Sequence, residues 1–304
     1  MEEVVFFSFE DAKSLLTDPR SGVKIKSLIE NEKLEILANK NLSAIDFDDE
    51  NVVLDGVIVP KSATFIYYPW KKTILVTHGK GIFNSLKYTR NNYKINASEQ
   101  AFLLERNVGV VGLSVGCSIV KTLVMEGLCG KLRISDFDTL DISNTNRIDW
   151  GVFDIGMTKI VLLYRWIKES NPFIEVEVFE KGIDENNVAH FFEPNSKCLD
   201  IVIDECDSLR TKIILRQYAK KMRIPLVMHT SDRGMLDIEN YRLESDFKSY
   251  LHDFEDYSEE ELQLNMAKII SEFCELKFAS ERAVYSFMEI GRSISSWPQL
   301  AQIS

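Results

Sequence analysis

The sequence predicts an α/β protein in which a mainly parallel sheet carries helices on both faces, preceded by a small mixed α/β domain. From Asn107 onward, short apolar runs alternate with amphipathic helical stretches, which is the pattern of parallel-sheet proteins. The apolar runs are continuous rather than alternating with polar residues, as expected for strands buried on both faces. A Gly-rich stretch separates the first of these strands from the helix that follows it.

The alternating part of the chain is expected to form one domain from residue 81 to residue 304. Its predicted strands cover residues 107–111, 131–135, 175–178, 200–203, 225–229 and 234–239. Its predicted helices cover residues 116–127, 156–170, 184–193 and 209–222. A long amphipathic pattern from Glu260 to about Ser293 predicts a further helical segment after the sheet.

Residues 1–80 show a different pattern and are expected to form the small N-terminal domain. Residues 1 to about 45 mix polar and apolar residues at helical spacing, with a break at Asp18-Pro19, and are predicted to be helical. β-branched and aromatic runs then predict strands, with a hairpin connection at residues 69–72, over residues 52–54, 57–59, 64–68 and 73–76.

Composition and charge exclude several classes of protein. The 304 residues carry a net charge of −11 with a pI of about 5.0, and this field repels phosphate backbones, so no nucleic-acid partner is expected. The five cysteines are scattered without a CxxC pair, which argues against a zinc site or a disulfide framework and for a cytoplasmic protein. No apolar run reaches the ~18 residues of a membrane span.

The Gly-rich turn Gly112-Leu113-Ser114-Val115-Gly116 lies between an apolar run and a helix, and the next strand ends on Asp136. This is the strand–turn–helix–strand–acid order of a Rossmann nucleotide-binding unit. In such a unit, backbone amides at the helix start face an anion and the acid accepts hydrogen bonds from ribose hydroxyls. The alternatives are that the glycines serve only the sterics of a tight turn, and that Asp136 is a solvated turn residue.

Two cations follow at positions where a nucleotide's phosphates would use them. Arg147 ends the polar cluster Ser143-Asn144-Thr145-Asn146-Arg147, and its planar guanidinium suits phosphate oxygens. Lys159 begins a predicted helix, where the helix dipole disfavours a cation unless an anion is bound there. The alternatives are a surface arginine paired with a nearby acid and an ordinary surface lysine.

Three acids, Asp204, Glu205 and Asp207, follow the strand at residues 200–203. Ligands collect at the carboxyl ends of strands in an open parallel sheet, and Mg²⁺ prefers oxygen ligands, so these acids are a candidate magnesium site with Asp207 as its main ligand. The alternative is structural, because Asp207 or Ser208 can cap the helix that starts at Leu209.

Together, the Gly-rich turn, the DxD sequence at Asp136, the SNxxR cluster, Lys159 and the D-x-x-D sequence ending at Asp207 resemble the ThiF/MoeB superfamily over residues 87–239. These proteins are ATP-dependent activators of ubiquitin-like and sulfur-carrier proteins. The resemblance implies that Asp136 holds the ribose, that Asp207 binds magnesium, and that the nucleotide and its phosphates are contacted by Gly112, Ser114, Gly116, Asn144, Arg147 and Lys159.

The same resemblance extends to Lys87-Tyr88-Thr89-Arg90-Asn91. It is similar to an upstream motif whose arginine often reaches into the partner subunit's site, which nominates Arg90 as a catalytic residue and implies a homodimer. The sequence is most similar to the ThiF-like modules associated with nitroreductase-like domains, so a nitroreductase-like partner is a further expectation.

The resemblance implies an adenylyltransferase that uses ATP and Mg²⁺ to convert a carboxylate into an acyl-adenylate. The carboxylate is expected to be the C-terminus of a ubiquitin-like protein, a sulfur-carrier protein or a peptide. The Gly-rich turn is shorter than the usual GxGGxG, the zinc-binding CxxC pairs of the family are absent, and no cysteine matches a thioester nucleophile. The alternatives are a catalytically inactive scaffold or dimer partner, and an NAD-binding oxidoreductase.

Overall fold

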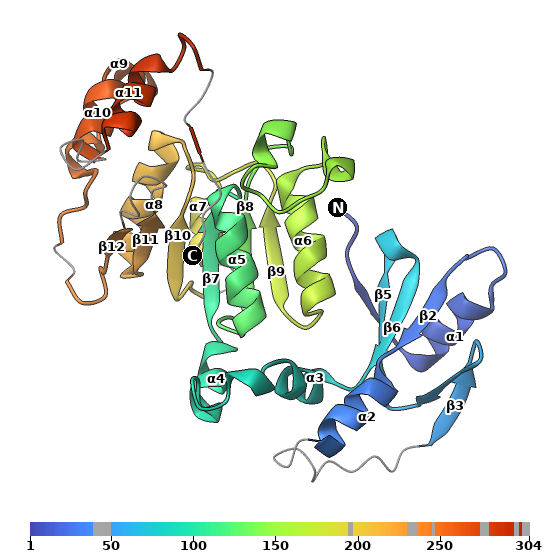
Figure 1. The fold of residues 1–304 in the computed structure, drawn as a ribbon. Coiled ribbons are helices and arrows are strands. Elements are labelled where there is room, and N and C mark those ends of the chain that lie inside the picture. The colour runs from blue at the N-terminus through green and yellow to red at the C-terminus, as the bar shows by residue number, and fades with distance from the viewer. Residues whose placement is uncertain are drawn as a thin grey trace. The chain divides into compact units, whose positions relative to one another are not determined.

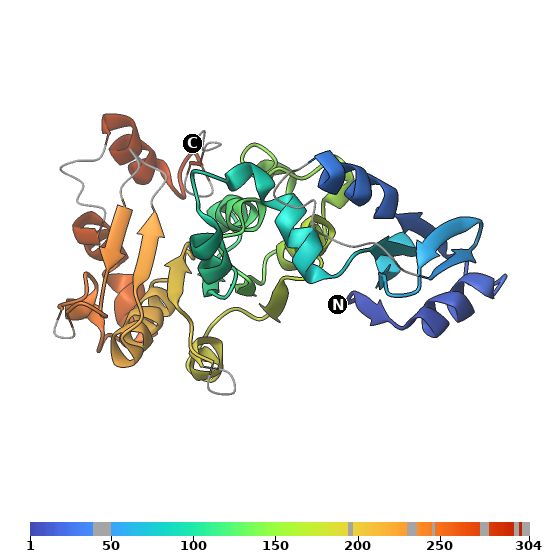
Figure 2. The ribbon, with the colours of Figure 1, turned by 90° about the horizontal axis from the view of Figure 1, so that it is seen from below.

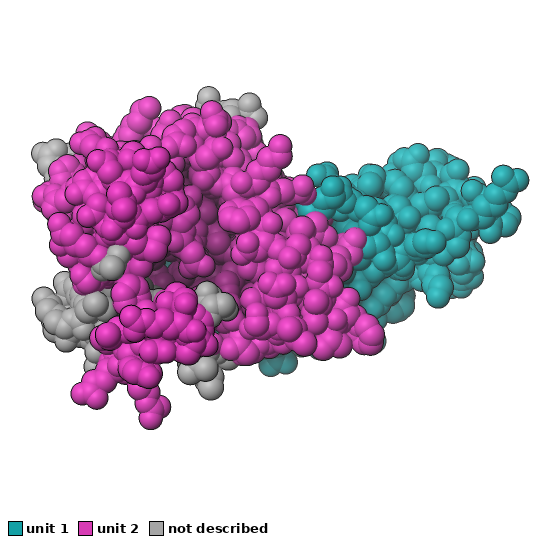
Figure 3. Space-filling model, turned by 90° about the horizontal axis from the view of Figure 1, so that it is seen from above, with its two compact units in different colours: residues 1–100, 168–173 teal, residues 101–167, 174–304 magenta. Residues whose placement is uncertain are grey.

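The structure is a computed structural model, and it describes residues 1–38, 50–193, 197–229, 236–244, 247–273, 280–294 and 298–299. The chain divides into two compact units, coloured separately in Figure 3. Unit 1 comprises residues 1–100 and 168–173, and unit 2 comprises residues 101–167 and 174–304. The first unit therefore extends past residue 80, the boundary expected from the sequence. Whether residues 1–80 are a domain in their own right stays a prediction.

Unit 1 is built on a four-stranded sheet of order β1-β5-β6-β2. Its strands are β1 (Val5–Phe7), β2 (Lys24–Ser27), β5 (Thr64–Tyr68) and β6 (Thr73–Thr77), and β3 (Asn51–Leu54) pairs with β4 (Val57–Pro60) in a separate hairpin. The predicted connection after Tyr68 is confirmed, because β5 and β6 are antiparallel and joined by a short helical turn at Pro69–Lys71. The unit also contains α1 (Phe9–Thr17), α2 (Ile29–Ala38) and α3 (Lys80–Lys87), and α4 (Ala97–Leu103) begins in it.

The prediction that residues 1–45 are helical, with a break at Asp18-Pro19, is wrong in two places. β1 pairs with β5 and β2 pairs with β6, so residues that follow a helical pattern form strands instead. Both pairings join segments far apart in the chain, and such tertiary pairing overrides local propensity. Residues 39–45 of that prediction lie outside the described residues.

Unit 2 is built on a six-stranded sheet of order β12-β11-β10-β7-β8-β9. The strands are β7 (Asn107–Val111), β8 (Lys131–Ser135), β9 (Glu175–Phe179), β10 (Ile201–Asp204), β11 (Leu226–His229) and β12 (Leu236–Glu239). All neighbours pair in parallel except β12, which is antiparallel to β11 at the edge. This is the 3-2-1-4-5-6 order of a Rossmann fold, and it confirms the predicted mainly parallel sheet.

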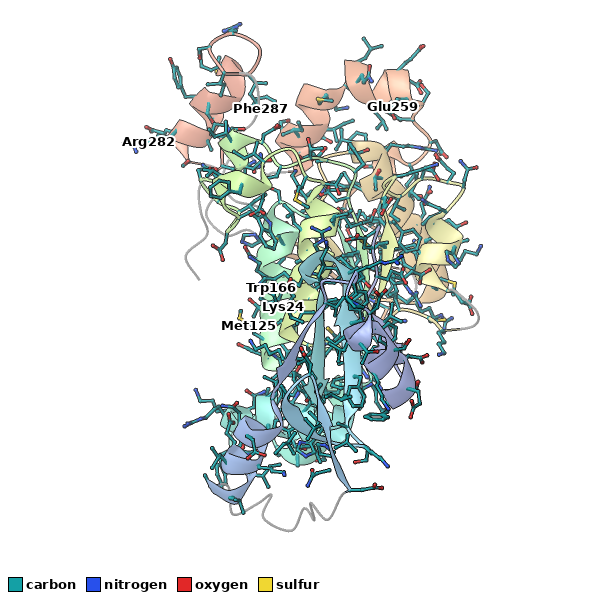
Figure 4. The ribbon with its side chains drawn as sticks, turned by 90° about the vertical axis from the view of Figure 1, so that its right-hand side faces the viewer. Lys24, Met125, Trp166, Glu259, Arg282 and Phe287 are labelled. Atoms are coloured by element: carbon teal, nitrogen blue, oxygen red, sulfur yellow. The ribbon has the colours of Figure 1, made fainter. Side chains whose placement is uncertain are left out.

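Helices cover both faces of this sheet (Figures 1 and 2). On one face, α5 (Val115–Glu126) and α6 (Lys159–Ser170) pack on β7 and β8 through a core that includes Val120, Leu163 and Ile134. Figure 4 labels Met125 on α5 and Trp166 on α6. On the other face, α7 (Val188–Phe192) and α8 (Leu209–Met222) pack through Phe191 and Leu215. Because the strands have apolar residues on both sides, both layers are needed to bury them.

The end of unit 2 is helical but interrupted. The predicted segment from Glu260 to Ser293 contains α9 (Glu259–Leu264), α10 (Met266–Phe273) and α11 (Glu281–Glu289), and Figure 4 labels Glu259 on α9 and Arg282 and Phe287 on α11. α9 ends at Asn265, whose side chain donates to the Glu261 carbonyl oxygen.

Of the helices that the structure describes, none is long and apolar enough to cross a membrane.

A buried charge network joins α8 to the edge of the sheet. Arg216 is 1% exposed, and its guanidinium lies 2.6 Å from Asp204, 3.0 Å from Asp237 and 3.0 Å from Glu239. Lys212 adds a second contact to Asp204, at 3.1 Å. Glu239 also accepts hydrogen bonds from Tyr241 and from the backbone of Tyr250. The antiparallel strand and the chain after it are thus tied to α8 through one arginine.

Replacing Arg216 with Met should lower the free energy of unfolding by about 3–5 kcal/mol, because Glu239 and Asp204 would keep buried charges without the guanidinium that pairs with both. Urea unfolding followed by circular dichroism measures this loss. Arg210→Met on the same helix is the matched control, since Arg210 pairs with an exposed Glu185 and such pairs contribute about 0–1 kcal/mol. Equal losses in both variants would contradict the role given to the network.

Candidate functional site

A pocket opens at the carboxyl ends of β7, β8, β9 and β10, and all of its lining residues belong to unit 2. Its volume is about 390 Å³. The strands rise towards the top of Figure 1, and in Figure 3, which views the molecule from that side, the surface of unit 2 is hollowed. β7 and β10 are neighbours here while the chain passes from β7 to β8 on the other side. This is the switch point where open α/β sheets bind ligands.

Most of the predicted site residues meet at this pocket. It is lined by Gly112, Ser114, Asp136, Asn144, Arg147, Lys159 and Asp207. Gly116 and Arg90 are not among its lining residues. The functional roles of all nine residues stay predictions, and the geometry below shows what each position offers.

The Gly-rich turn approaches the loop after β10 very closely. Gly112 has a φ of +90°, and a Cβ at this position would lie 2.4 Å from the Glu205 carbonyl oxygen. Only glycine therefore fits. Its N–H donates to the Ser135 carbonyl oxygen at the end of β8. Gly116 lies within α5, where an added Cβ would be 3.0 Å from a Val110 methyl group, so it allows close packing of helix on strand.

Asp136 is not the solvated turn residue of the alternative interpretation, because it is only 9% exposed. One carboxylate oxygen accepts a hydrogen bond of 2.6 Å from the Leu113 N–H, and the other accepts one of 2.7 Å from the Asp138 N–H. Burial raises the pKa of Asp136, while these two hydrogen bonds and the charge of Lys159 oppose the shift. A carboxylate offers about four lone-pair positions, so acceptor capacity remains for ribose hydroxyls.

Arg147 lies beside the Gly-rich turn. Its Nε donates to Ser114 Oγ at 3.2 Å, and its Nη1 donates to the Ser143 carbonyl oxygen and to Asn146 Oδ1 at 3.1 and 2.9 Å. Burial lowers the pKa of Arg147, and the negative charge of Asp207 opposes that shift, so these two side chains are within electrostatic reach. The guanidinium is thus held by neutral acceptors from the Gly-rich turn and from its own polar cluster.

Lys159 is the first residue of α6 and is only 6% exposed, which excludes an ordinary surface lysine. Its Nζ lies 2.8 Å from Asp138 Oδ2, and its N–H donates to the Asp138 carbonyl oxygen. The anion expected from its helix position is thus a carboxylate of the same pocket. Nearby, Asn144 is buried, and its Oδ1 accepts a hydrogen bond from the Asp141 N–H.

The three acids after β10 do not act together. Asp204 is fully buried, and its pKa is lowered by Lys212 and Arg216 against the effect of burial, so its inclusion in a magnesium site is wrong. Asp207 is exposed into the pocket, and Ser208 caps α8 by accepting the Thr211 N–H. Among the described residues there is no group of three or more acids, histidines or cysteines able to hold a metal.

Glu205 is a pocket residue whose separate role the sequence did not distinguish. Its Oε1 accepts a hydrogen bond of 3.0 Å from the His229 N–H at the end of β11. Burial raises the pKa of Glu205 to about 7, and the charge of Asp207 adds to this shift. The sequence analysis also did not predict that Lys181 and Gly182, which follow β9, line the pocket. Their position after a parallel strand could have identified them, since residues that follow parallel strands lie at the same edge of the sheet.

Replacing Glu205 with Gln should remove one contribution to the pH dependence of the free energy of unfolding. The measurement uses protein without added nucleotide, with EDTA present to remove metal. A carboxyl whose pKa rises from 4.5 to about 7 on folding is protonated more in the folded state, so the free energy of unfolding falls as the pH rises through that window. Urea unfolding at pH 5.5 and pH 8 should show a loss of at most about 3 kcal/mol in the parent protein. Glu205→Gln keeps the acceptor for His229, and an undiminished slope in this variant would contradict the assignment.

Arg90 lies on a short helical turn, Thr89–Asn91, in unit 1. The residues that line the pocket all belong to unit 2. Its participation in the site, within one chain or across a dimer, stays a prediction.

Residues 88–234 match the ThiF family. The chain carries a ThiF family domain. This ThiF domain spans every predicted site residue, from Arg90 to Asp207, and the match confirms the assignment to the ThiF/MoeB superfamily made from the motifs. An association with nitroreductase-like domains is not tested by it.

Several relatives share parts of this chain. An uncharacterized protein of Mycobacterium tuberculosis, MT1398, is 36% identical over 251 residues, covering 81% of this chain and 34% of that protein. An adenylyltransferase and sulfurtransferase of Anopheles gambiae is 27% identical, covering 49% of this chain and 34% of its own. The tRNA threonylcarbamoyladenosine dehydratase of Escherichia coli is 30% identical, and the match covers 44% of this chain and 49% of the dehydratase. The chain thus spans half or less of the length of these relatives.

Among solved structures, that of the Escherichia coli dehydratase in complex with ATP is similar to this chain with a TM-score of 0.46. The two are 25% identical, and the similarity covers 51% of this chain and 62% of the dehydratase chain.

Proposed function

We propose that this protein is an ATP- and Mg²⁺-dependent adenylyltransferase that activates a carboxylate as an acyl-adenylate. The observation that carries the proposal is the meeting of Asp136, Arg147, Lys159 and Asp207 at one pocket, at the switch point of the sheet. A ribose-holding acid, two cations and a further acid are the groups that a nucleoside triphosphate needs. The Anopheles gambiae relative is named as an adenylyltransferase, which agrees with this chemistry.

In the proposed reaction, a carboxylate oxygen of the substrate attacks the α-phosphorus of ATP. A new bond forms between that oxygen and phosphorus, the bond to the oxygen bridging the α- and β-phosphates breaks, and pyrophosphate leaves with the electron pair. The protein supplies position and charge rather than covalent chemistry. Arg147 and Lys159 offset the negative charge on the phosphates, and Asp136 orients the nucleoside through its ribose.

Mg²⁺ is proposed to enter with the nucleotide, because it is commonly held by one or two carboxylates together with phosphate oxygens and water. Asp207 can serve as such a single carboxylate, since it is exposed and lines the pocket. The described residues contain no larger group of acids that could hold the ion alone. The ion supplies charge neutralisation for the phosphates when it is bound.

The carboxylate is proposed to belong to the C-terminus of a ubiquitin-like or sulfur-carrier protein or of a peptide. The tRNA in the name of the Escherichia coli relative is not carried over, because the net charge of −11 opposes a polyanionic substrate. A homodimer in which Arg90 serves the partner subunit's pocket, and a nitroreductase-like partner domain, remain part of the proposal.

The two alternative functions can be distinguished from the proposed one by the nucleotide that the protein binds. An inactive scaffold would show no heat on titration with ATP and Mg²⁺, and no thermal stabilisation. An NAD-binding oxidoreductase would bind NADH more tightly than ATP, and it would leave Arg147, Lys159 and Asp207 without a function. Calorimetric titration with ATP and NADH distinguishes all three.

Asp207→Ala and Arg147→Ala should each slow the exchange of labelled pyrophosphate into ATP by about 100-fold or more, which is the usual loss when one charge-stabilising group is removed. The assay uses a panel of peptides with free C-termini as substrates and total tRNA as a competing candidate.

C-terminally amidated copies of the same peptides are the substrate control and should give no exchange. Gln217→Ala, on the exposed face of α8, is the variant control and should exchange normally. Full exchange in both Asp207→Ala and Arg147→Ala would remove the site assignment, and exchange only with tRNA would replace the proposed substrate.

A further inference from the structure

The chain returns to the pocket near its C-terminal end. Gln299 is among the residues that line the pocket. The other lining segments lie much earlier in the chain: the Gly-rich turn, the SNxxR cluster and the loop after β10. The main-chain oxygen of Gln299 accepts a hydrogen bond of 2.8 Å from Asn146 Nδ2, across 153 residues of sequence. One contact thus brings a distant residue to the edge of the nucleotide site.

Asn146 uses both ends of its side-chain amide. Its Oδ1 accepts a hydrogen bond of 2.9 Å from Arg147 Nη1, and its Nδ2 donates to Gln299. Gln299 is therefore attached next to the Arg147 guanidinium, which is proposed to contact a phosphate of ATP. This is the end of the pocket that holds Ser114 of the Gly-rich turn, since Arg147 Nε donates to Ser114 Oγ.

The side chain of Gln299 has an unmet hydrogen-bonding need. Its Oε1 is buried and has no hydrogen-bond partner among the described residues. An unpaired buried polar group destabilises the folded state, and such a group in a native structure calls for a missing partner such as a ligand. The terminal amide turns readily about its last bond, and either its oxygen or its NH₂ group can face the pocket.

The charges around Gln299 decide between these two orientations. Arg147 and Lys159 line the same pocket and attract an anion, and a phosphate oxygen only accepts hydrogen bonds. An amide that faces a phosphate therefore presents its NH₂ group, and it adds no further negative charge to a pocket that already contains Asp136, Asp138 and Asp207.

Building on the proposed function, we propose that Gln299 is a nucleotide-binding residue whose side-chain amide donates to a phosphate oxygen. Asn146 is the positioning residue that holds Gln299 at the phosphate end of the pocket. The nucleotide site then includes a residue that follows the ThiF domain, whose match ends at residue 234.

The test is calorimetric titration of the full chain with ATP and Mg²⁺. Gln299→Ala should bind ATP about five- to tenfold more weakly, the loss of one hydrogen bond. Gln299→Glu should bind more weakly still, because its carboxylate meets the phosphates. If instead the Gln299 oxygen accepts from an amino or hydroxyl group of the nucleoside, Glu keeps that acceptor and binds better than Ala, which would overturn the phosphate contact.

The positioning role of Asn146 is tested by a double-mutant cycle. Asn146→Ala removes the attachment, so adding Gln299→Ala to it should weaken ATP binding by less than twofold further. Equal effects of Gln299→Ala in both backgrounds would overturn this role, because the two residues would act independently. Gln217→Ala is the matched control and should bind like the parent protein.

The outcomes separate the two proposals. ATP binding by the parent protein with unchanged affinity in Gln299→Ala overturns the inference about Gln299 and leaves the proposed function intact. Absence of ATP binding in the parent protein overturns both.

Discussion

The close approach of the Gly-rich turn to the loop after β10 is the constraint on which the candidate site depends. A Cβ at residue 112 would lie 2.4 Å from the Glu205 carbonyl oxygen, so the two loops can meet only through a glycine. Their meeting places Ser114 and Asp207, which follow different strands, at one pocket. The parallel pairing of β7 with β10 sets the loops at the same edge of the sheet, and the missing side chain lets them close. The short glycine turn therefore packs directly against the loop that carries Asp207.

The two cations that are proposed to contact the phosphates are held in the pocket by different kinds of partner. Lys159 is paired with Asp138, whereas Arg147 is held by Ser114, Ser143 and Asn146, which carry no charge. The two cations thus differ in what a phosphate must displace. Arg147 is oriented in advance at little cost, while Lys159 has to be shared with, or released by, a carboxylate. Pre-oriented donors of this kind are what favours charge development during phosphoryl transfer.

The sequence predicted the fold of unit 2 and the residues of the pocket well, because both follow from patterns that are local in the chain. Continuous apolar runs identified the strands, and the position of each polar residue after a strand placed it at the ligand-binding edge. What it could not predict depends on contacts between distant segments. β1 and β2 are strands because β5 and β6 pair with them, and Asp204 is unavailable to a metal because Arg216 and Lys212 reach it from α8.

Asp204 and Asp207 show how far a short motif alone can be interpreted. Both are acids at the end of the same strand, and the sequence cannot tell them apart. The strand continues through Asp204, which belongs to the buried network with Arg216, whereas Asp207 lies in the loop and opens onto the pocket. The first acid anchors the strand end to α8, and the second remains available for the proposed ligand. The loop proposed to meet the ligand thus follows a strand end that is fixed to α8 by buried ion pairs.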